Sequence, residues 1–442
     1  MTDFQSDILE ELEWRGFIHQ STDGEALDER LASGAVALYC GFDPTARSLQ
    51  VGNLVSLMLL AHFRRHGHDP VALVGGATGL IGDPSGKSQE RQLMTEAELA
   101  DNVAGQSAQI DRVLDRALEM HSETLGETDA HADGIPLLNN ADWMSEQTFI
   151  GFLRDVGKHF RVNQMMNKES VRARLEDREQ GISYAEFSYM VLQAYDYLHL
   201  FREHGCELQV GGSDQWGNIT AGIDLIGRVA GEEAHGLTAP LVTDRSGKKL
   251  GKSVDGAVYL DPDMTSPYEF YQYWVRRDDA EVPQLLKMFT FLPREEIDAL
   301  VETIERDENR GEVQEKLAWE VTALVHGEEE ADFAVKASDV LYGGSIEGLD
   351  DAELEAIFAD VPSSTWERER LEEGIHIRTL FDETDLQNSR GAAKRLIKQG
   401  GAYLNNEKIE DWNYEVTEQD LAGETMLVAR SGKKNYHLVK FR

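Results

Sequence analysis

The sequence predicts an α/β protein, in which a Rossmann-like parallel-sheet domain is followed by an α-helical domain and a small α+β domain. Three observations carry this prediction. Residues 35–76 alternate between strand and helix patterns, residues from about 266 to 360 are patterned as helices, and the charge balance changes near residue 375. A chain of 442 residues is long enough for roughly two to four domains, each with its own core.

The strand and helix patterns near the N-terminus form a βαβ unit. AVALYCGF (35–42) has the β-branched and aromatic content of a buried strand, and VALVGG (71–76) is a second one. Between them lie a loop, DPTARSLQ, and the helical pattern LVSLMLLAHFRRHG. This spacing predicts a parallel sheet whose ligand site lies at the carboxyl ends of the strands.

The rest of the chain continues the α/β pattern and then becomes helical. Amphipathic stretches cover about 90–205, and LQVGGSDQWGN (208–218) is typical of a strand that runs into a glycine-rich turn. The helical region that follows becomes increasingly acidic, and PSS (362–364) is a candidate linker. No internal repeat is found.

Composition predicts a cytoplasmic protein without a membrane segment. Apolar runs such as LVSLMLLA (54–61) are far shorter than the roughly 18 residues that span a bilayer, and the N-terminus is acidic. The only cysteines, Cys40 and Cys206, are too few for a disulfide framework or a zinc cluster.

The formal net charge of -38 is unevenly distributed. Residues 375–442 carry 11 Lys and Arg against 10 Asp and Glu, which leaves 32 against 71 in the preceding residues. We interpret the acidity as a halophilic adaptation, because concentrated salt screens the self-repulsion of such a surface. The nearly neutral tail leaves nucleic-acid binding open there.

Three segments are candidate phosphate sites. GLIGDPSGKS (79–88) resembles a P-loop but has Ile81 where that motif needs glycine. QVGNL (50–54) lies where the first helix begins, so it is either an anion site or a simple N-cap. TDRSGKKLGKSVDG (243–256) gathers Lys248, Lys249 and Lys252, which are either phosphate ligands or solvated surface lysines.

Two further segments indicate a polar pocket. In YMVLQAYD (189–196), Tyr189, Gln193 and Asp196 fall on one helical face among apolar neighbours. Asp214 and Gln215 follow a strand on a tight turn, where site residues concentrate.

The motifs YCGFDPTA, LQVGNL, VALVGGATGLIGDPSGK, FLRDVGKHF, EFSYMVLQAYD, QVGGSDQWGNITAG, KKLGKS and SGKKNYHL, in this order, resemble the bacterial tyrosyl-tRNA synthetases, which are class I enzymes. The resemblance covers essentially the whole chain. It implies a catalytic domain with a connective insertion over 1–242, a mobile lysine loop over 243–256, an α-helical anticodon-binding domain over 257–360, a linker over 361–374 and an RNA-binding domain over 375–442. It also implies tyrosine–tRNA ligase activity, with ATP and Mg²⁺ as a substrate complex, L-tyrosine and tRNA(Tyr) as partners, and no tightly bound cofactor or metal.

The resemblance assigns a role to each matching residue. Tyr39 and Asp196 would bind the phenol hydroxyl of tyrosine, Asp83, Tyr189 and Gln193 its ammonium group, and Gln209 and Gln215 the carboxylate side. The ATP site would include Cys40, Gly41, Asp43, Gly52, Asn53, Asp214, Lys249, Gly251, Lys252 and Ser253. Thr45, Gln50, Lys249 and Lys252, with Lys87 and Arg91 near the entry, would act on the phosphates and so be catalytic.

Two positions depart from the family signature. Gln50 and Asn53 stand where the histidines of the HIGH motif are expected, and Gln50 lacks an imidazole that can carry charge. The resemblance therefore leaves the rate of the first step in doubt.

Outside the active site, the resemblance implies two interfaces. FLRDVGKHFRVNQMM (152–166) corresponds to the subunit interface of a homodimer. In the tail, Arg390, Lys394, Arg395 and Lys398 recur at helical spacing and would form an RNA-binding face. His66 and His68 have a spacing that suits a metal on a strand, but a solvated helix terminus is the favoured interpretation.

Two other functions stay open from the residues alone. A small-molecule kinase would require GDPSGKS to open a helix, and a non-catalytic RNA-binding protein would form no adenylate. Tryptophanyl-tRNA synthetase is disfavoured by the Tyr39 and Asp196 pair.

Overall fold

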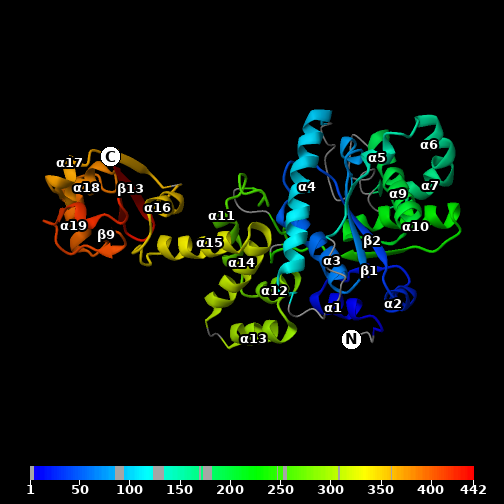
Figure 1. The fold of residues 1–442 in the computed structure, drawn as a ribbon, viewed down its shortest axis with the longest axis horizontal. Coiled ribbons are helices and arrows are strands. Elements are labelled where there is room, and N and C mark those ends of the chain that lie inside the picture. Colours follow the sequence, from blue (N-terminus) through cyan, green and yellow to red (C-terminus); the bar gives the residue numbers. More distant parts are fainter. Residues whose placement is uncertain are drawn as a thin grey trace. The chain divides into compact units, whose positions relative to one another are not determined.

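The computed structural model folds into two compact units, Met1–Ala331 and Asp332–Arg442 (Figure 1). It describes residues 4–84, 94–122, 134–168, 171–172, 182–245, 247–251, 256–306, 309–359 and 361–442. Within these residues, no helix is long and apolar enough to cross a membrane.

The first unit is built on a six-stranded sheet in the order β1-β6-β5-β2-β3-β4. The strands are β1 (Gln20–Ser21), β2 (Ala37–Phe42), β3 (Asp69–Val74), β4 (Leu137–Asn139), β5 (Cys206–Gly212) and β6 (His235–Ala239). All neighbours are parallel except β1, which is antiparallel to β6. The chain leaves β2 toward β3 on one side and returns as β5 on the other, so the predicted ligand crevice lies at the carboxyl ends of β2 and β5.

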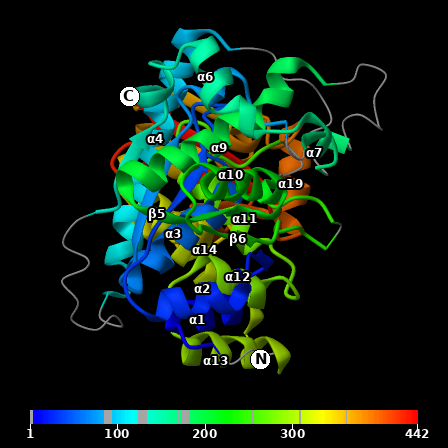
Figure 2. The same ribbon diagram turned by 90° about the vertical axis from the view of Figure 1, so that its right-hand side faces the viewer.

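Helices cover both faces of this sheet (Figures 1 and 2). α3 (Leu54–Arg65) and α4 (Glu96–Glu119) pack on one face, and α9 (Tyr184–His204) and α10 (Trp216–Val229) lie side by side on the other. α3 is buried along nearly its whole length, which explains its apolar sequence. The predicted βαβ unit is therefore confirmed, although β3 ends before Gly75.

The remaining elements of the first unit precede, interrupt or follow this core. They are α1 (Asp7–Arg15), α2 (Gly24–Ala32), α5 (Ala141–Met144), α6 (Phe149–Asp155), α7 (Val162–Met166), α11 (Pro267–Val275), α12 (Val282–Phe289), α13 (Arg294–Glu305) and α14 (Arg310–His326). Short 3-10 turns lie at η1 (Val51–Asn53), η2 (Thr78–Leu80), η5 (Gly157–His159) and η6 (Ser213–Gln215).

Hydrogen bonds from two arginines connect the helices after β6 to the rest of the first unit. The Arg15 guanidinium donates to the carbonyls of Lys287, Thr290 and Leu292, and Arg116 on α4 donates to the carbonyls that end α14. The helical region is thus part of the first compact unit.

The second unit holds a five-stranded sheet in the order β10-β9-β12-β13-β7. Its strands are β7 (Ser363–Trp366), β9 (Ala402–Leu404), β10 (Glu407–Lys408), β12 (Met426–Ser431) and β13 (Asn435–Phe441), and β8 (Ile375–His376) pairs separately with β11 (Glu415–Val416). The helices are α15 (Glu328–Leu341), which begins before the unit boundary, α16 (Asp351–Ile357), α17 (Glu369–Glu372), α18 (Ile377–Glu383) and α19 (Arg390–Lys398), and η7 (Glu418–Asp420) is a 3-10 turn.

The expected linker over 361–374 is wrong. Residues 363–366 form β7, which runs parallel to β13, and Trp366 and Leu371 are buried in the core of this unit. The Ser-Ser pair indicated a linker, but it begins the edge strand β7, which is short and is recognisable only through its partner β13.

Candidate active site

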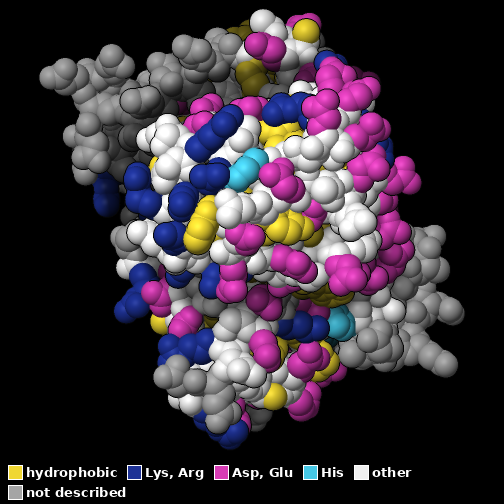
Figure 3. All heavy atoms as spheres, turned by 90° about the vertical axis from the view of Figure 1, so that its left-hand side faces the viewer, with side chains coloured by type: hydrophobic (Ala, Val, Ile, Leu, Met, Phe, Trp, Pro, Cys, Tyr) yellow, Lys and Arg dark blue, Asp and Glu magenta, His cyan; other side chains and the backbone are white. Residues whose placement is uncertain are grey.

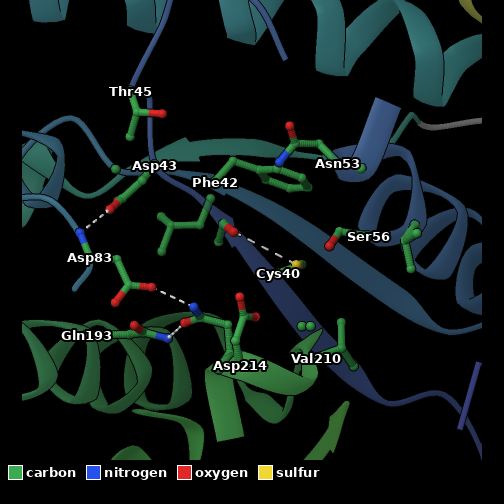
Figure 4. A pocket seen from close by; sticks show the side chains of 18 of the residues that line it. Cys40, Phe42, Asp43, Thr45, Asn53, Ser56, Asp83, Gln193, Val210 and Asp214 are labelled. Atoms are coloured by element: carbon green, nitrogen blue, oxygen red, sulfur yellow. Dashed lines mark hydrogen bonds between the residues drawn. The ribbon is translucent and has the colours of Figure 1, made fainter. Parts of the chain in front are cut away.

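A pocket of about 400 Å³ opens at the carboxyl ends of β2 and β5 (Figure 4). The structure brings together here most of the residues singled out from the sequence, namely Tyr39, Cys40, Gly41, Asp43, Thr45, Gln50, Gly52, Asn53, Asp83, Tyr189, Gln193, Asp196, Gln209, Asp214, Gln215 and Lys249. Lys87, Arg91, Lys252 and Ser253 lie outside the described residues. Gly251 is described but does not line the pocket.

A buried carboxyl lies at the inner end of the pocket. Asp196 on α9 accepts hydrogen bonds from Asn140 Nδ2 at 2.9 Å and from Trp143 Nε1 at 2.7 Å. Burial raises the pKa of Asp196 to about 7, although these two hydrogen bonds lower it. The carboxyl is therefore poised to change its charge near neutral pH.

Beside it, two buried polar atoms lack partners among the described residues. They are the hydroxyl of Tyr39 and the Oε1 atom of Gln209, and both side chains line the pocket. Burial, together with the nearby Asp196 carboxyl, holds the pKa of Tyr39 well above its usual value. A buried hydroxyl without a partner is costly, so this end of the pocket is suited to a ligand that carries a polar atom.

Carboxylates and amides form a network on one wall. Asp43 accepts hydrogen bonds from the Tyr189 hydroxyl at 2.7 Å and from the Thr78 hydroxyl at 2.9 Å. Gln215 donates to Asp83 and accepts from Gln193. Figure 4 shows Asp83, Gln193 and Asp214 on one side of the pocket, facing Thr45 and Asn53 on the other. The network concentrates negative charge, which favours a cationic group.

The opposite wall is formed by the start of α3. Asn53 Oδ1 accepts a hydrogen bond from the Gln50 N–H at 2.9 Å, so Asn53 does act as part of a cap. The side chains of Gln50 and Asn53 also line the pocket, as do Gly52 and Thr45. The N-cap and ligand interpretations of QVGNL are compatible, because the helix N-terminus faces the cavity.

The lysine loop reaches the pocket through Lys249, whose Nζ atom lies 3.8 Å from Asp214 Oδ2. Gly247 and Gly251 have φ values of 81° and 87°, which explains why glycine stands at both positions. Lys248 does not line the pocket and is exposed.

Main-chain hydrogen bonds join the two signature segments. The N–H of Val258 donates to the carbonyl of Gly251 at 2.8 Å, and its carbonyl accepts from the N–H of Val51 at 3.1 Å. The Tyr273 hydroxyl in turn accepts from the N–H of Gly251 at 2.9 Å. Neither of these two roles could be predicted from the sequence. Val258 acts only through its backbone atoms, and Tyr273 acts through a side chain from a helix that follows the loop.

Asn140 and Trp143 were also missed. They belong to NADW (140–143), which directly follows β4, and polar residues at the carboxyl end of a parallel strand are a recognisable signal. The strand itself is too short to be detected by its periodicity.

The two histidines of HGHDP lie in different environments. His66 ends α3, but His68 is buried and its Nδ1 atom accepts a hydrogen bond from the N–H of Val36 at 3.2 Å. Burial lowers the pKa of His68 to about 4. The expectation of a solvated helix end is thus wrong for His68. No group of three or more potential metal ligands occurs among the described residues.

The described part of GLIGDPSGKS does not open a helix. Residues 78–80 form η2, and the next helix among the described residues, α4, begins at Glu96, where Thr95 and Glu98 form its capping box. The kinase interpretation required GDPSGKS to open a helix, and residues 85–88 of this motif lie outside the described residues.

The basic residues of the tail lie together on α19. Lys394 and Lys398 place their Nζ atoms 4.6 Å and 4.7 Å from the centre of the Trp412 ring. Arg390 and Arg395 are exposed on the same helix. Figure 3 shows Lys and Arg side chains gathered toward one side of the visible face and Asp and Glu toward the other.

Comparisons with known proteins agree with this geometry. Residues 32–343 match the family model for class I tRNA synthetases (W and Y), and residues 353–439 match that for the SYY-like C-terminal domain of tyrosine–tRNA ligases. The chain is 48% identical to the tyrosine–tRNA ligase of Rhodopirellula baltica, an alignment covering 98% of this chain and 96% of that protein. It is 45% identical to the enzyme of Staphylococcus haemolyticus over 98% of this chain and 99% of that protein.

A solved structure shows the same fold. The C-terminally truncated mitochondrial tyrosyl-tRNA synthetase of Aspergillus nidulans superposes with a TM-score of 0.69 at 33% identity, covering 76% of this chain and 94% of that chain. The family match spans the sheet domain, the pocket and the late helices, so the chain belongs to the class I tRNA synthetases of the tryptophan and tyrosine group.

Proposed function

We propose that this chain is a tyrosine–tRNA ligase, which activates tyrosine with ATP to give tyrosyl-adenylate and pyrophosphate and then transfers tyrosine to the 3′ end of tRNA(Tyr). The observation that carries the choice of amino acid is the buried pair at the inner end of the pocket. Tyr39 offers a hydroxyl without a partner among the described residues, next to the Asp196 carboxyl. A phenol hydroxyl can donate to the Asp196 carboxylate and accept from the Tyr39 hydroxyl, whereas a phenyl ring bonds to neither group and an indole N–H can donate but not accept.

The rest of the tyrosine molecule fits the polar wall. Asp83, Tyr189 and Gln193 receive the ammonium group, and the carboxylates of Asp43 and Asp83 supply the negative charge that favours it. Gln209 and Gln215 line the side of the pocket that receives tyrosine and its carboxylate, which is the attacking nucleophile. Because Gln209 Oε1 lacks a partner among the described residues, it also has capacity for a donor from the ligand.

ATP occupies the side of the pocket formed by the start of α3 and the lysine loop. Cys40, Gly41, Asp43 and Asp214 lie toward the ribose, and Gly52 and Asn53 lie toward the adenosine. Thr45, Gln50 and Lys249 face the phosphates, together with Gly251, Lys252, Ser253, Lys87 and Arg91. Magnesium arrives with ATP and is held mainly by phosphate oxygens and water.

The reaction requires positioning and electrostatic stabilisation. The tyrosine carboxylate attacks the α-phosphorus, and the bond to the bridging oxygen of pyrophosphate breaks. Negative charge moves onto the departing pyrophosphate, so donors aimed at its oxygens stabilise the transition state more than bound ATP. No side chain acts as a nucleophile.

We further propose that the chain forms a homodimer through α6 and α7. Exposed apolar side chains gather on these helices and at the start of α9, namely Phe149, Ile150, Leu153, Val162, Met166 and Tyr184. Ile150 is 72% exposed and Phe149 67%, which is unfavourable for a surface that stays in water. This patch includes much of the expected interface over 152–166. Light scattering tests it: Ile150→Glu yields a monomer, whereas Val335→Glu, at an exposed apolar residue outside the patch, leaves the dimer intact.

The C-terminal unit, by this proposal, holds the tRNA through the basic face of α19, which carries Arg390, Lys394, Arg395 and Lys398. The acidic remainder of the surface reflects a halophilic, cytoplasmic protein. Such a surface is stable only where salt screens its charge, so activity and the free energy of unfolding increase with salt concentration.

An exchange assay between ATP and labelled pyrophosphate tests the central proposal. Exchange depends on tyrosine and is not supported by tryptophan or phenylalanine. Comparable exchange with tryptophan would assign the other amino acid of this group, and formation of ADP instead of AMP would indicate a kinase.

A further inference from the structure

One face of α4 holds the segment that connects β2 to α3. Asn102, Gln106 and Gln109 occur at i, i+4 and i+7, so their primary amides lie on the same side of the helix. We refer to these three residues as the amide ladder. Their position in the sequence, far from both signature motifs, gives no indication of a role in the reaction.

Each amide bonds a different polar group of residues 44–49. Asn102 Nδ2 donates to the carbonyl of Pro44 at 3.1 Å, and Gln106 Nε2 donates to the carbonyl of Ala46 at 2.8 Å. Gln109 Oε1 accepts from the N–H of Leu49 at 2.9 Å and lies 3.1 Å from the Ser48 hydroxyl. The ladder thus offers donors where the segment has carbonyls and an acceptor where it has an N–H.

The contact between α4 and this segment is close and largely buried. Gln106 and Gln109 are 2% and 3% exposed. A Cβ atom at Gly105 would lie 2.5 Å from the carbonyl oxygen of Arg47, so glycine is required for the helix to approach the segment. Buried hydrogen bonds of this kind fix a backbone more firmly than exposed ones, because no water replaces them when they break.

The segment held in this way carries the two side chains that bracket the phosphate side of the pocket. Thr45 lies between the two carbonyls that the ladder bonds, and Gln50 directly follows Leu49. Both line the pocket, as does Gln106 itself. A small displacement of donors from the position of a developing charge lowers the rate strongly.

We propose that Asn102, Gln106 and Gln109 are positioning residues for adenylate formation, holding Thr45 and Gln50 against the phosphates of ATP. This inference rests on the proposed function, since it requires that the first step use ATP at this pocket. The ladder acts through the backbone of residues 44–49 and leaves the tyrosine end of the pocket unchanged.

The same chemical change at two neighbouring positions separates this role from a general loss of packing. Gln106→Glu replaces a donor by an oxygen that faces the carbonyl of Ala46, whereas Gln109→Glu keeps the acceptor for Leu49. Both add one carboxylate at similar burial. In single-turnover experiments we expect Gln106→Glu to slow adenylate formation by about 10-fold to 10²-fold, and Gln109→Glu to slow it at least fivefold less.

Two further measurements complete the test. Gln106→Met lacks the donor and adds no charge, so it must also slow the first step. In all three variants, the Kd for tyrosine must stay within about twofold of that of the unmodified chain. In a double-mutant cycle with Thr45→Val, the loss caused by Gln106→Met must shrink, because the residue acts through the segment that carries Thr45.

The proposal is overturned if Gln106→Glu and Gln109→Glu form adenylate equally slowly, or if Gln106→Met is fully active. It is also overturned if the rate of the double variant falls by the product of the losses in Gln106→Met and Thr45→Val. Tyrosine-dependent exchange by the unmodified chain is the separate test of the proposed function. If the unmodified chain shows no such exchange, the proposed function is wrong. If it does show exchange and the ladder variants are fully active, only the inference about the amide ladder is wrong.

Discussion

The indole nitrogen of Trp143 donates a hydrogen bond to Asp196 at 2.7 Å, and the two residues are both buried at the inner end of the pocket. Trp143 therefore lowers the pKa of a carboxyl that burial raises to about 7. The balance of these two effects sets the pH at which the carboxylate is available to accept a phenol hydrogen.

The first prediction concerns pH. Asp196 is largely neutral below about pH 7 and largely ionised above it, so kcat/KM for tyrosine should increase as pH rises through this value and then level off. Trp143→Phe removes a donor that lowers the pKa, and it should move the midpoint to higher pH. A profile for tyrosine that is flat between pH 6 and 8 would contradict the assignment, and the profile for ATP serves as the control.

Tyr39→Phe should reduce selectivity for tyrosine over phenylalanine. The variant removes the hydroxyl that lacks a partner among the described residues, so tyrosine loses one hydrogen bond, worth about 1 kcal/mol, or roughly fivefold in KM. Phenylalanine no longer leaves that hydroxyl unpaired, so its exchange rate should increase. Exchange assays with both amino acids measure the ratio, and an unchanged ratio would place the phenol elsewhere.

Lys249→Ala should slow adenylate formation by about 10² or more, because a donor aimed at departing pyrophosphate is worth several kcal/mol in the transition state. Lys248→Ala is the matched control, since this neighbour does not line the pocket, and its loss should be less than about threefold. Equal losses would mean that the loop contributes only general positive charge.

Gln50→His tests the departure from the family signature. An imidazolium can make a charge-assisted hydrogen bond where the amide makes a neutral one, a difference of about 1 kcal/mol or roughly fivefold in the first-step rate. The gain should fade as pH rises above the pKa of the new imidazole. Pre-steady-state rates across pH 6 to 9 are the measurement, and a pH-independent gain would argue against a charged donor.

The last prediction uses the end of α15, the helix that crosses the boundary between the two units. A chain ending at residue 342 should keep tyrosine-dependent exchange and lose most tRNA charging, because every described pocket residue lies between 39 and 250. A chain ending at residue 374 should instead aggregate, since it retains β7, Trp366 and Leu371 without the strands that bury them. Full charging by the shorter chain would end the RNA-binding proposal.

Local patterns predicted much of the fold and the site. β2 and α3 are largely apolar and α19 is amphipathic, so these elements could be recognised from the sequence. On α9, Tyr189, Gln193 and Asp196 fall on one helical face, and all three line the pocket. Elements of two to four residues, such as β4 and β7, have no measurable period and were missed. Hydrogen bonds between residues far apart in the sequence, such as Asn140 with Asp196 or Gln106 with Ala46, could not be predicted, because they depend on how the helices pack on the sheet.

The link through Val258 has an evolutionary consequence. Its two hydrogen bonds to Val51 and Gly251 use only peptide groups, so they persist with any side chain that fits the position. Proline would break the bond to Gly251, because it lacks the N–H, and the burial of residue 258 limits its replacements to apolar side chains of similar size. Exchanges among such side chains can therefore accumulate at residue 258 without weakening the connection between the two motifs.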